Sequence, residues 1–375
     1  MTMKSLLVVF RADASVQIGT GHVMRCLTLA EGLRRQGHQC AFICRDHKGH
    51  LADLIAQKGF ELHLLAMPEQ TDKLVKNQQA PAYTDWLGVP WQADAEQTRQ
   101  ILLQHKVDWL VVDHYALDAH WERQTAQAVC QIMVIDDLAD REHDCAVLLD
   151  QNLGRAVSDY YQRVPLSCKK LIGPQYALLR PEFAEFRPAS LERRRTSELK
   201  RILISLGGVD RTNVTGQVLD AFSNITLPSD TELDIIMGTA APYLDAVKQQ
   251  AFDLPFQATV NVSVSDMAER MCRADLAIGS AGGTAWERCC LGLPSVLIVL
   301  AENQISGSDA LVRAGAALTL ERDKPLSLAL TLVLERLSDR TNLSRITGAA
   351  ESVTDGNGAP RVCCVLQEIA KGGYE

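Results

Sequence analysis

The sequence contains no Cys-x-x-Cys pair, no Asp-x-Asp triplet and no apolar run long enough to span a membrane. Without Cys-x-x-Cys, zinc-ribbon and dithiol redox sites lose their usual ligand pattern. The 11 cysteines are scattered, so we expect buried thiols in a reducing cytoplasm rather than a disulfide framework. The apolar stretch between Lys4 and Arg11 is too short for a signal peptide or a membrane span. These absences predict a cytoplasmic protein without a membrane partner.

An excess of positive charge is also lacking, because 38 basic residues face 46 acidic ones and the formal charge is −8. The densest basic cluster is Arg193-Arg194-Arg195, and three charges neutralise few phosphates. We interpret this triplet as a solvated face or a linker. The charge pattern therefore argues against a nucleic-acid partner.

Length and hydrophobic pattern predict two α/β domains. A chain of 375 residues exceeds the usual single-domain size. Short runs rich in Val, Ile and Leu alternate with longer amphipathic stretches, which is typical of parallel strands buried beneath helices. The predicted strands are 5–10, 40–44, 61–65, 109–113, 132–136 and 146–150, then 201–206, 232–237, 259–264, 276–278, 295–299 and 317–320; residues 360–371 predict a helix.

Two stretches interrupt this pattern. Residues 68–97 are rich in Gln, Pro and Trp and predict a long excursion from the core. Residues 187–200 are rich in Arg, Glu, Ser and Pro and predict an exposed connection between domains. We therefore expect domains at 1–190 and 191–375, with the last helix able to pack back on the first domain. Because open α/β sheets bind ligands beyond the carboxyl ends of their strands, we expect the substrate in a cleft between the domains.

The first predicted strand is followed by Gly19-Thr20-Gly21-His22 and a helical pattern. Gly19 and Gly21 allow the backbone to approach a ligand, and the start of a helix favours an anion. The third glycine of a dinucleotide fingerprint would fall at Met24, so NAD binding is not expected.

The second half repeats the strand-to-glycine transition twice, at Leu206-Gly207-Gly208 and from Gly279 into a run of small residues. For any single loop, a tight turn chosen for packing is an equal alternative. Three such loops together predict a diphosphate site built from backbone donors. Glu287 follows the last loop, where a carboxylate can bind ribose hydroxyls, although an exposed surface Glu is an equal alternative. The small residues of this candidate UDP site are Ser280, Ala281, Gly282, Gly283 and Thr284.

One polar cluster is a possible metal site. It lies at the end of the predicted strand 132–136 and lacks the regular spacing of metal ligands, so we favour a solvated strand end. We accordingly expect no metal and no cofactor. The cluster comprises Asp136, Asp137, Asp140, His143, Asp144 and Cys145.

Several motifs together resemble a known family. They are Phe-Arg-Ala-Asp-Ala-Ser at 10–15, Ile-Gly-Thr-Gly-His-Val-Met-Arg-Cys at 18–26, Val-Asp-His-Tyr at 112–115, Gly-Pro-Gln-Tyr-Ala-Leu-Leu-Arg at 173–180 and Glu-Asn-Gln at 302–304. The chain resembles the UDP-sugar hydrolases of pseudaminic acid biosynthesis, which are similar to MurG-type glycosyltransferases. The resemblance implies two Rossmann-like domains facing across a cleft, the GT-B architecture, with UDP held mainly by the second.

The resemblance also implies a reaction. UDP would be removed from a diacetamido-trideoxy sugar, with inversion and without a metal. His22 falls on the catalytic histidine of the family, and Tyr115 and Asn303 fall on supporting positions. Glu287 falls on the position that holds the ribose, and Gln304 follows Asn303 in the matching motif.

A single histidine suffices chemically because UDP leaves as a stable anion, so the enzyme needs only a base for water. The positive end of a helix disfavours imidazolium and favours a His22 able to accept a proton. We hypothesise that Asp13, in the same loop, orients the ring. The alternatives are a packed or capping role for His22 and a core-closing role for Tyr115. We expect His114 to be structural.

Two other function classes remain open. A GT-B glycosyltransferase would pass the sugar from its UDP donor to an acceptor hydroxyl, and a non-catalytic protein would only bind the sugar nucleotide. In each case we expect a small-molecule partner and a monomer.

Overall fold

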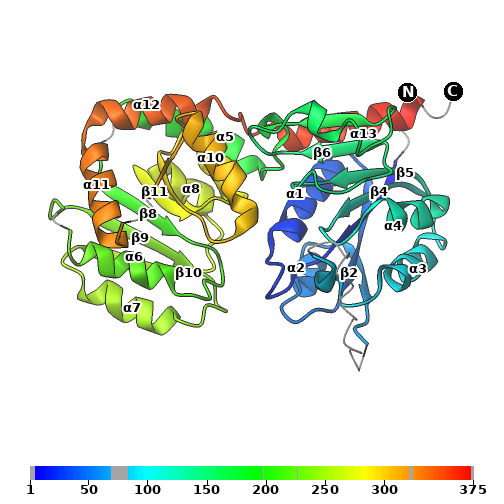
Figure 1. Cartoon of the computed structure of the whole chain (residues 1–375), viewed down its shortest axis with the longest axis horizontal. Helices are drawn as coiled ribbons and strands as arrows, with labels where there is room; N and C mark the ends of the chain where they lie inside the picture. Colours follow the sequence, from blue (N-terminus) through cyan, green and yellow to red (C-terminus); the bar gives the residue numbers. More distant parts are fainter. Residues whose placement is uncertain (1–4, 69–82, 197, 226, 321–323, 373–375) are drawn as a thin grey trace. The chain divides into compact units, whose positions relative to one another are not determined.

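The computed structural model describes residues 5–68, 83–196, 198–225, 227–320 and 324–372. The chain forms two compact units, each built around its own parallel sheet (Figure 1). Unit 1 comprises residues 1–178 together with 358–375, and unit 2 comprises residues 179–357. The predicted class of two α/β Rossmann-like domains is confirmed.

Unit 1 contains a seven-stranded parallel sheet in the order β3-β2-β1-β4-β5-β6-β7. The central strands are buried on both faces, which explains their continuous apolar runs. The chain reverses direction of winding between β1 and β4, and ligands of such sheets bind at this switch point. The strands are β1 Leu7–Ala12, β2 Gln39–Arg45, β3 Glu61–Leu65, β4 Val107–Asp113, β5 Val129–Ile135, β6 Val147–Asp150 and β7 Lys169–Ile172.

Helices cover both faces of this sheet. One core cluster joins the sheet to α1, α2 and α13, and a second joins the opposite face to α3 and α4. The C-terminal helix α13 contacts α1, although the two are at opposite ends of the sequence. The elements are α1 Gly21–Arg35, α2 Ala52–Gln57, α3 Trp91–Leu102, α4 Ala119–Thr125 and α13 Gly358–Gly372, with short 3-10 helices η1 Thr84–Leu87, η2 Ala126–Ala128, η3 Val157–Tyr160 and η4 Pro174–Tyr176.

Unit 2 contains a six-stranded parallel sheet in the order β10-β9-β8-β11-β12-β13. Its core cluster joins the sheet to α6, α7, α11 and α12. The strands are β8 Arg201–Ser205, β9 Glu232–Met237, β10 Gln257–Val262, β11 Leu276–Ser280, β12 Ser295–Ile298 and β13 Leu318–Thr319. The helices are α5 Pro181–Arg194, α6 Val214–Phe222, α7 Leu244–Asp253, α8 Met267–Arg273, α9 Thr284–Cys290, η5 Glu302–Gln304, α10 Ile305–Arg313, α11 Leu326–Ser338 and α12 Arg340–Glu351.

Every predicted strand overlaps an observed one. The prediction of irregular structure for residues 68–97 and for residues 187–200 is wrong in part. Residues 69–82 of the predicted excursion lie outside the described residues, whereas from Trp91 onward it forms α3. The predicted linker is largely helix α5, and Arg194 is buried there. Its guanidinium donates to the carbonyls of Leu291, Ala274 and Met271, so this charge anchors a helix.

The chain passes from unit 1 to unit 2 between residues 178 and 179. The boundary predicted at residues 190/191 therefore falls inside α5, which packs on α8 and α9 of unit 2. All 11 cysteines are free thiols. Within the described ranges, each helix is either too short or too polar to cross a membrane.

Candidate active site

His22 lies at the start of α1 and meets a carboxylate from the neighbouring strand. Its Nδ1 is 2.6 Å from Oδ1 of Asp113, the last residue of β4. Asp113 stands beside Ala12 in the register of β4 with β1, so the sheet brings it to the point where α1 begins. Arg25, one helical turn after His22, donates to both oxygens of Asp113 at 2.6 and 2.7 Å. His22, Asp113 and Arg25 thus form one cluster at the carboxyl edge of the sheet.

Electrostatics fix the protonation state of this cluster. Burial alone raises the pKa of Asp113, but the Arg25 charge and His22 outweigh burial and hold the pKa below its ordinary value. Burial lowers the pKa of Arg25, and the charges of Asp113 and Asp137 more than reverse this effect. Asp113 is therefore an ionised acceptor, so Nδ1 of His22 carries the proton that it donates to Asp113. In the neutral ring, Nε2 is then the nitrogen that can accept a proton.

The predicted partner of His22 was wrong. Asp13 instead accepts from Arg11 at 2.6 Å and from the backbone N–H of Arg45 at 2.7 Å. Asp13 directly follows β1, and its side chain is fully buried. Proximity in the sequence suggested Asp13, whereas proximity across the sheet selects Asp113. The signal available in the sequence was a polar residue directly after the apolar run 109–112 of β4.

Tyr115 does lie beside His22. The two rings make an edge-to-face contact with centroids 4.6 Å apart, and the Tyr115 hydroxyl donates to Asp137 at 2.8 Å. Burial raises the pKa of Tyr115 well above its ordinary value, and Asp137 raises it further, so the hydroxyl stays protonated. The indole of Trp86 stacks on the Tyr115 ring, with ring centroids 5.6 Å apart. The aromatic contacts hold the rim of the His22 cluster in place.

His114, which we expected to be structural, lies among the buried side chains of unit 1. Its Nδ1 accepts from the backbone N–H of Ala116 at 3.1 Å, and its Nε2 lies 3.4 Å from Asp13. Burial lowers the pKa of His114 to about 3, so it is neutral at physiological pH. These contacts are consistent with a ring that supports the loop after β4.

The buried part of unit 1 also contains an ion network that the sequence did not reveal. Asp94 of α3 accepts from Arg11 of β1 and from Arg45 of β2, each at 2.6 Å, and from the indole N–H of Trp121 at 3.0 Å. The side chains of Arg11, Arg45 and Asp94 are fully buried. Isolated buried charges are costly, and this mutual pairing is what makes them tolerable. The network links α3, β1 and β2, and Arg11 connects it to Asp13.

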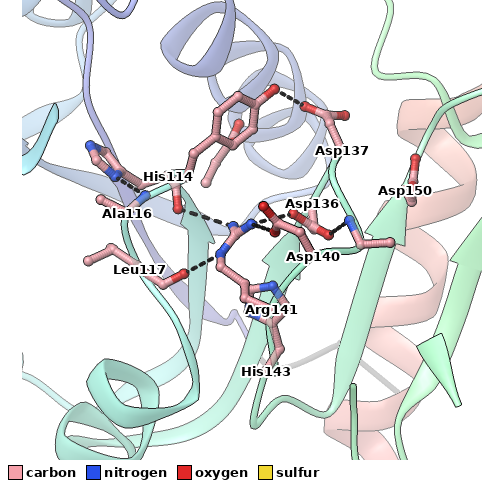
Figure 2. A network of polar contacts seen from close by, with 12 residues as sticks. His114, Ala116, Leu117, Asp136, Asp137, Asp140, Arg141, His143 and Asp150 are labelled. Atoms are coloured by element: carbon pink, nitrogen blue, oxygen red, sulfur yellow. Dashed lines mark hydrogen bonds and ion pairs between the residues drawn. The ribbon is translucent and has the colours of Figure 1, made fainter. Parts of the chain in front are cut away.

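The polar stretch after β5 is occupied by internal ion pairs (Figure 2). Arg141 donates to Asp136 at 2.9 Å and to Asp140 at 3.0 Å, and Tyr160 donates to the other oxygen of Asp136 at 2.8 Å. Asp136 is fully buried, so the interpretation of a solvated strand end is wrong for this residue. Among the described residues, no three metal-ligating side chains of this stretch converge. Asp136 and Asp140 thus serve the fold of unit 1, whereas Asp137 contacts Arg25 and Tyr115 of the His22 cluster.

Gly19 and Gly21 frame the loop before His22. Gly19 has φ 83° and its N–H donates to the carbonyl of Ser15 at 2.8 Å, so a positive φ is needed to close this turn. Gly21 is the first residue of α1, and a Cβ there would meet nothing within 4 Å. Open space at the helix start is compatible with close approach of a ligand.

The loop after β8 in unit 2 carries Gly207 and Gly208. Gly207 has φ 100°, and a Cβ on either glycine would meet nothing within 4 Å. The N-terminus of α6 is not available to a ligand, because Asp210 accepts from the N–H groups of Val214 and Thr215 at 2.9 and 2.8 Å. Any anion at this loop therefore depends on the glycine backbone rather than on the helix end.

The loop after β11 leads into α9. Arg288 is fully buried behind it and donates to the carbonyl of Ser280 at 2.6 Å and to Thr284 Oγ1 at 3.2 Å. Gln304 lies beside the loop after β11, because the Nε2 of Gln304 would be 3.8 Å from a Cβ placed on Gly282. This bracing fixes the course of the loop, and Arg288 is a residue that sequence reasoning missed. The predicted loop residues present here are Ser280, Ala281, Gly282, Gly283 and Thr284.

Glu287 on α9 keeps only 16% of its side chain exposed, so it is not a surface glutamate. Burial raises its pKa to about 7, partly opposed by Arg180, whose guanidinium lies 3.7 Å away. Asn303 is exposed in η5, beside Gln304. The predicted site residues thus fall into two groups: His22 and Tyr115 belong to unit 1, whereas Asn303, Gln304, Glu287 and both glycine loops belong to unit 2.

Comparisons with known proteins relate the chain to proteins that act on sugars. Residues 202–355 match the family model of the glycosyltransferase family 28 C-terminal domain. The chain is 24% identical to the spore coat polysaccharide biosynthesis protein SpsG of Bacillus subtilis, over 96% of this chain and 97% of that protein. It is 26% identical to the UDP-2,4-diacetamido-2,4,6-trideoxy-beta-L-altropyranose hydrolase of Campylobacter jejuni, over 82% of this chain and 97% of that protein.

Among solved structures, MurG of Acinetobacter baumannii is similar, with a TM-score of 0.69 and 16% identity. The match covers 97% of this chain and 100% of that chain. At this identity the likeness shows the fold alone, which is two Rossmann-like domains of the kind found in GT-B proteins.

Proposed function

We propose that this protein hydrolyses a UDP-linked 2,4-diacetamido-2,4,6-trideoxy sugar and releases UDP and the free sugar. The observation that carries this proposal is the 2.6 Å contact between His22 Nδ1 and Asp113, which leaves Nε2 as the proton acceptor. The Campylobacter jejuni relative, whose name states this hydrolysis, supports the choice of substrate.

The proposed reaction needs one base. Water attacks the anomeric carbon while His22 Nε2 takes a proton from it, the carbon–oxygen bond to UDP breaks, and the electron pair leaves with the diphosphate. Attack opposite the leaving group inverts the anomeric centre. Asp113 stabilises the imidazolium that forms, and Arg25 keeps Asp113 ionised and correctly placed. Nothing need protonate UDP, because its leaving oxygen belongs to a phosphate.

Unit 2 would bind the nucleotide. The backbone of Gly207 and Gly208 and the loop from Ser280 to Thr284 would donate to the diphosphate. Glu287 would accept from the ribose hydroxyls, and Asn303 and Gln304 would complete the polar contacts. The exposed position of Gly208 and the open space above it support this assignment.

We also propose that the step proceeds without a metal. The carboxylates of Asp136 and Asp140, two of the candidate metal ligands after β5, are already paired with Arg141. Charge on the leaving diphosphate would be met by backbone donors instead. Activity that survives thorough chelation is the expected result, and restoration by an added cation would contradict this part of the proposal.

The decisive experiment is turnover in 18O-labelled water with the UDP-sugar and no acceptor. Hydrolysis at carbon places the label in the free sugar, whereas label in UDP would show attack at phosphorus and remove the role given to His22. The His22→Ala variant is expected to lose turnover while it still binds UDP. A variant that retained turnover would exclude the base, and a protein of purely binding function would show no turnover in either form.

A glycosyltransferase is the second candidate, favoured by the family model matched over residues 202–355. It would use the same UDP site and deliver the sugar to an acceptor hydroxyl. Rapid UDP release without an acceptor supports the hydrolase. Release that requires an added acceptor, with a sugar–acceptor product, would establish the transferase instead.

A further inference from the structure

Three side chains that the proposed reaction does not use lie close together in unit 1. They are near the amino-terminal ends of the strands, whereas His22 and Asp113 are at the carboxyl-terminal ends. They are Glu61 and His63 of the edge strand β3 and His105 of the turn after α3. One ligand atom from each lies within 4.8 Å of the other two, and among the described residues this is the single group of such side chains. We propose that they form a binding site for a Zn²⁺ ion that ties the sheet edge to the end of α3.

The strand geometry explains why two of these residues act together. Glu61 and His63 are two residues apart in β3, so both point to the same face of the sheet. His63 Nε2 lies 3.2 Å from Glu61 Oε1. Ile43 is the register partner of His63, and it belongs to the core cluster beneath α3. This face is therefore the one that α3 covers.

His105 approaches from the other side of the recess. It follows α3 by a short turn, in which its N–H donates to the carbonyl of Leu102 at 3.1 Å. Its ring centroid lies 6.2 Å from that of His63. Leu102, Glu61, His63 and His105 line one small recess, whose floor includes Ala41 and Val107. The C-terminal end of α3 contributes partial negative charge, which favours a cation there.

The donor set selects the ion. Two imidazole nitrogens and one carboxylate oxygen are a recurrent zinc set, completed by water, whereas Ca²⁺ and Mg²⁺ prefer oxygen donors throughout. None of the three side chains is fully buried, so an ion can reach them and keep a water ligand. The set is poorly suited to an Fe–S cluster or Cu⁺, which prefer thiolates.

The position separates this site from the candidate active site. Glu61 is the first residue of β3, and His105 precedes the first residue of β4, whereas Asp113 is the last residue of β4. In a parallel sheet, the first residues of the strands and the last residues of the strands lie at opposite ends of the strands. A Zn²⁺ ion at Glu61, His63 and His105 would therefore stabilise unit 1 without entering the reaction, and the inference does not depend on the proposed function.

The first test is titration of the reduced, chelator-treated full chain with Co²⁺ as a spectroscopic probe, followed by displacement with Zn²⁺. We expect about one equivalent of high-affinity ion, a visible d–d band and no thiolate charge-transfer band. His63→Ala and His105→Ala should each weaken binding by at least about tenfold, because each removes one of three protein ligands. His120→Ala is the matched control, because His120 is exposed on the same unit and lies outside the recess.

One further variant and one further measurement test whether the ion binds at this site. His22→Ala should bind Zn²⁺ as the wild type does, which separates this site from the His22 cluster. Zn²⁺ should raise the thermal midpoint of the wild type and of His120→Ala but not of His63→Ala. Absence of binding, binding through thiolates, or unchanged affinity in both His63→Ala and His105→Ala would each overturn the site.

Discussion

Different kinds of residues lie at the carboxyl-terminal ends of the strands in the two sheets. In unit 1 these ends are filled with buried charges in fixed partnerships, such as His22 with Asp113 and Asp94 with Arg11. In unit 2 they are followed by loops of small residues, where Gly208 faces open space. A preorganised ion cluster can hold a proton acceptor in one tautomer, whereas an exposed glycine backbone can approach a diphosphate. In the proposed function, the unit 1 residues would supply the base and the unit 2 loops would bind the diphosphate.

The sharpest way to break this comparison is Asp113→Asn. The amide group can donate to Nδ1 of His22, which would place the ring proton on Nε2 and remove the proton acceptor. We expect kcat to fall by about 10²- to 10⁴-fold with UDP affinity unchanged. The measurement is steady-state hydrolysis of the UDP-sugar together with UDP binding by calorimetry.

Asp137→Asn is the matched control for that variant. Asp137 contacts Arg25 and Tyr115 but lies one partner away from His22. Its effect on kcat should be much smaller than that of Asp113→Asn. Equal losses in the two variants would mean that general polarity, and not the tautomer of His22, matters at this edge.

The second prediction concerns stability. Asp94→Asn removes the charge that pairs with Arg11 and Arg45 and leaves buried cations without full compensation. We expect the free energy of unfolding of unit 1 to fall by about 3–5 kcal/mol, measured as a lower urea midpoint.

The control for Asp94→Asn comes from unit 2. Asp245→Asn breaks an exposed pair with Lys248, where Asp245 is 98% exposed, and should leave the midpoint nearly unchanged. If Asp94→Asn were as mild as Asp245→Asn, the buried network would contribute nothing beyond surface pairing.

The third prediction tests the glycine edge. Gly208→Val should fold normally, because a Cβ meets nothing within 4 Å and the position does not need a positive φ. The same side chain would occupy the space through which a diphosphate reaches the backbone, so we expect UDP affinity to fall by at least about tenfold. Gly348→Val in α12 also points into open space and should bind UDP normally. Normal UDP binding by Gly208→Val would remove this loop from the site.

What the sequence predicted follows from the range of each interaction. A buried parallel strand is visible in the sequence as a local apolar run, and β3 and β9 were predicted with their observed bounds. The strand β7 was missed because half of Lys169–Ile172 is lysine. Gly-rich loops and His22 are equally local signals. In contrast, the partner of His22 depends on which strands are neighbours, and β4 reaches β1 only through the sheet order. Asp94 was hidden for the same reason, because its partners come from β1 and β2.

The smallest expected effect is on the pH dependence of stability. Asp113 in unit 1 and Glu287 in unit 2 should contribute to it with opposite signs. The pKa of Asp113 is lowered, so its contribution to stability is present above its ordinary pKa and is lost only in strong acid as the pH falls through the folded value. The pKa of Glu287 is raised by burial to about 7 from 4.5. Its protonated form therefore contributes stability that is fully present below pH 4.5 and is lost as the pH rises to about 7. Urea unfolding of the wild type should show this decline between pH 4.5 and about pH 7, the unfolded and folded pKa values of Glu287. Glu287→Gln should flatten it, because the amide does not ionise, and an unchanged slope in that variant would assign the decline to other groups.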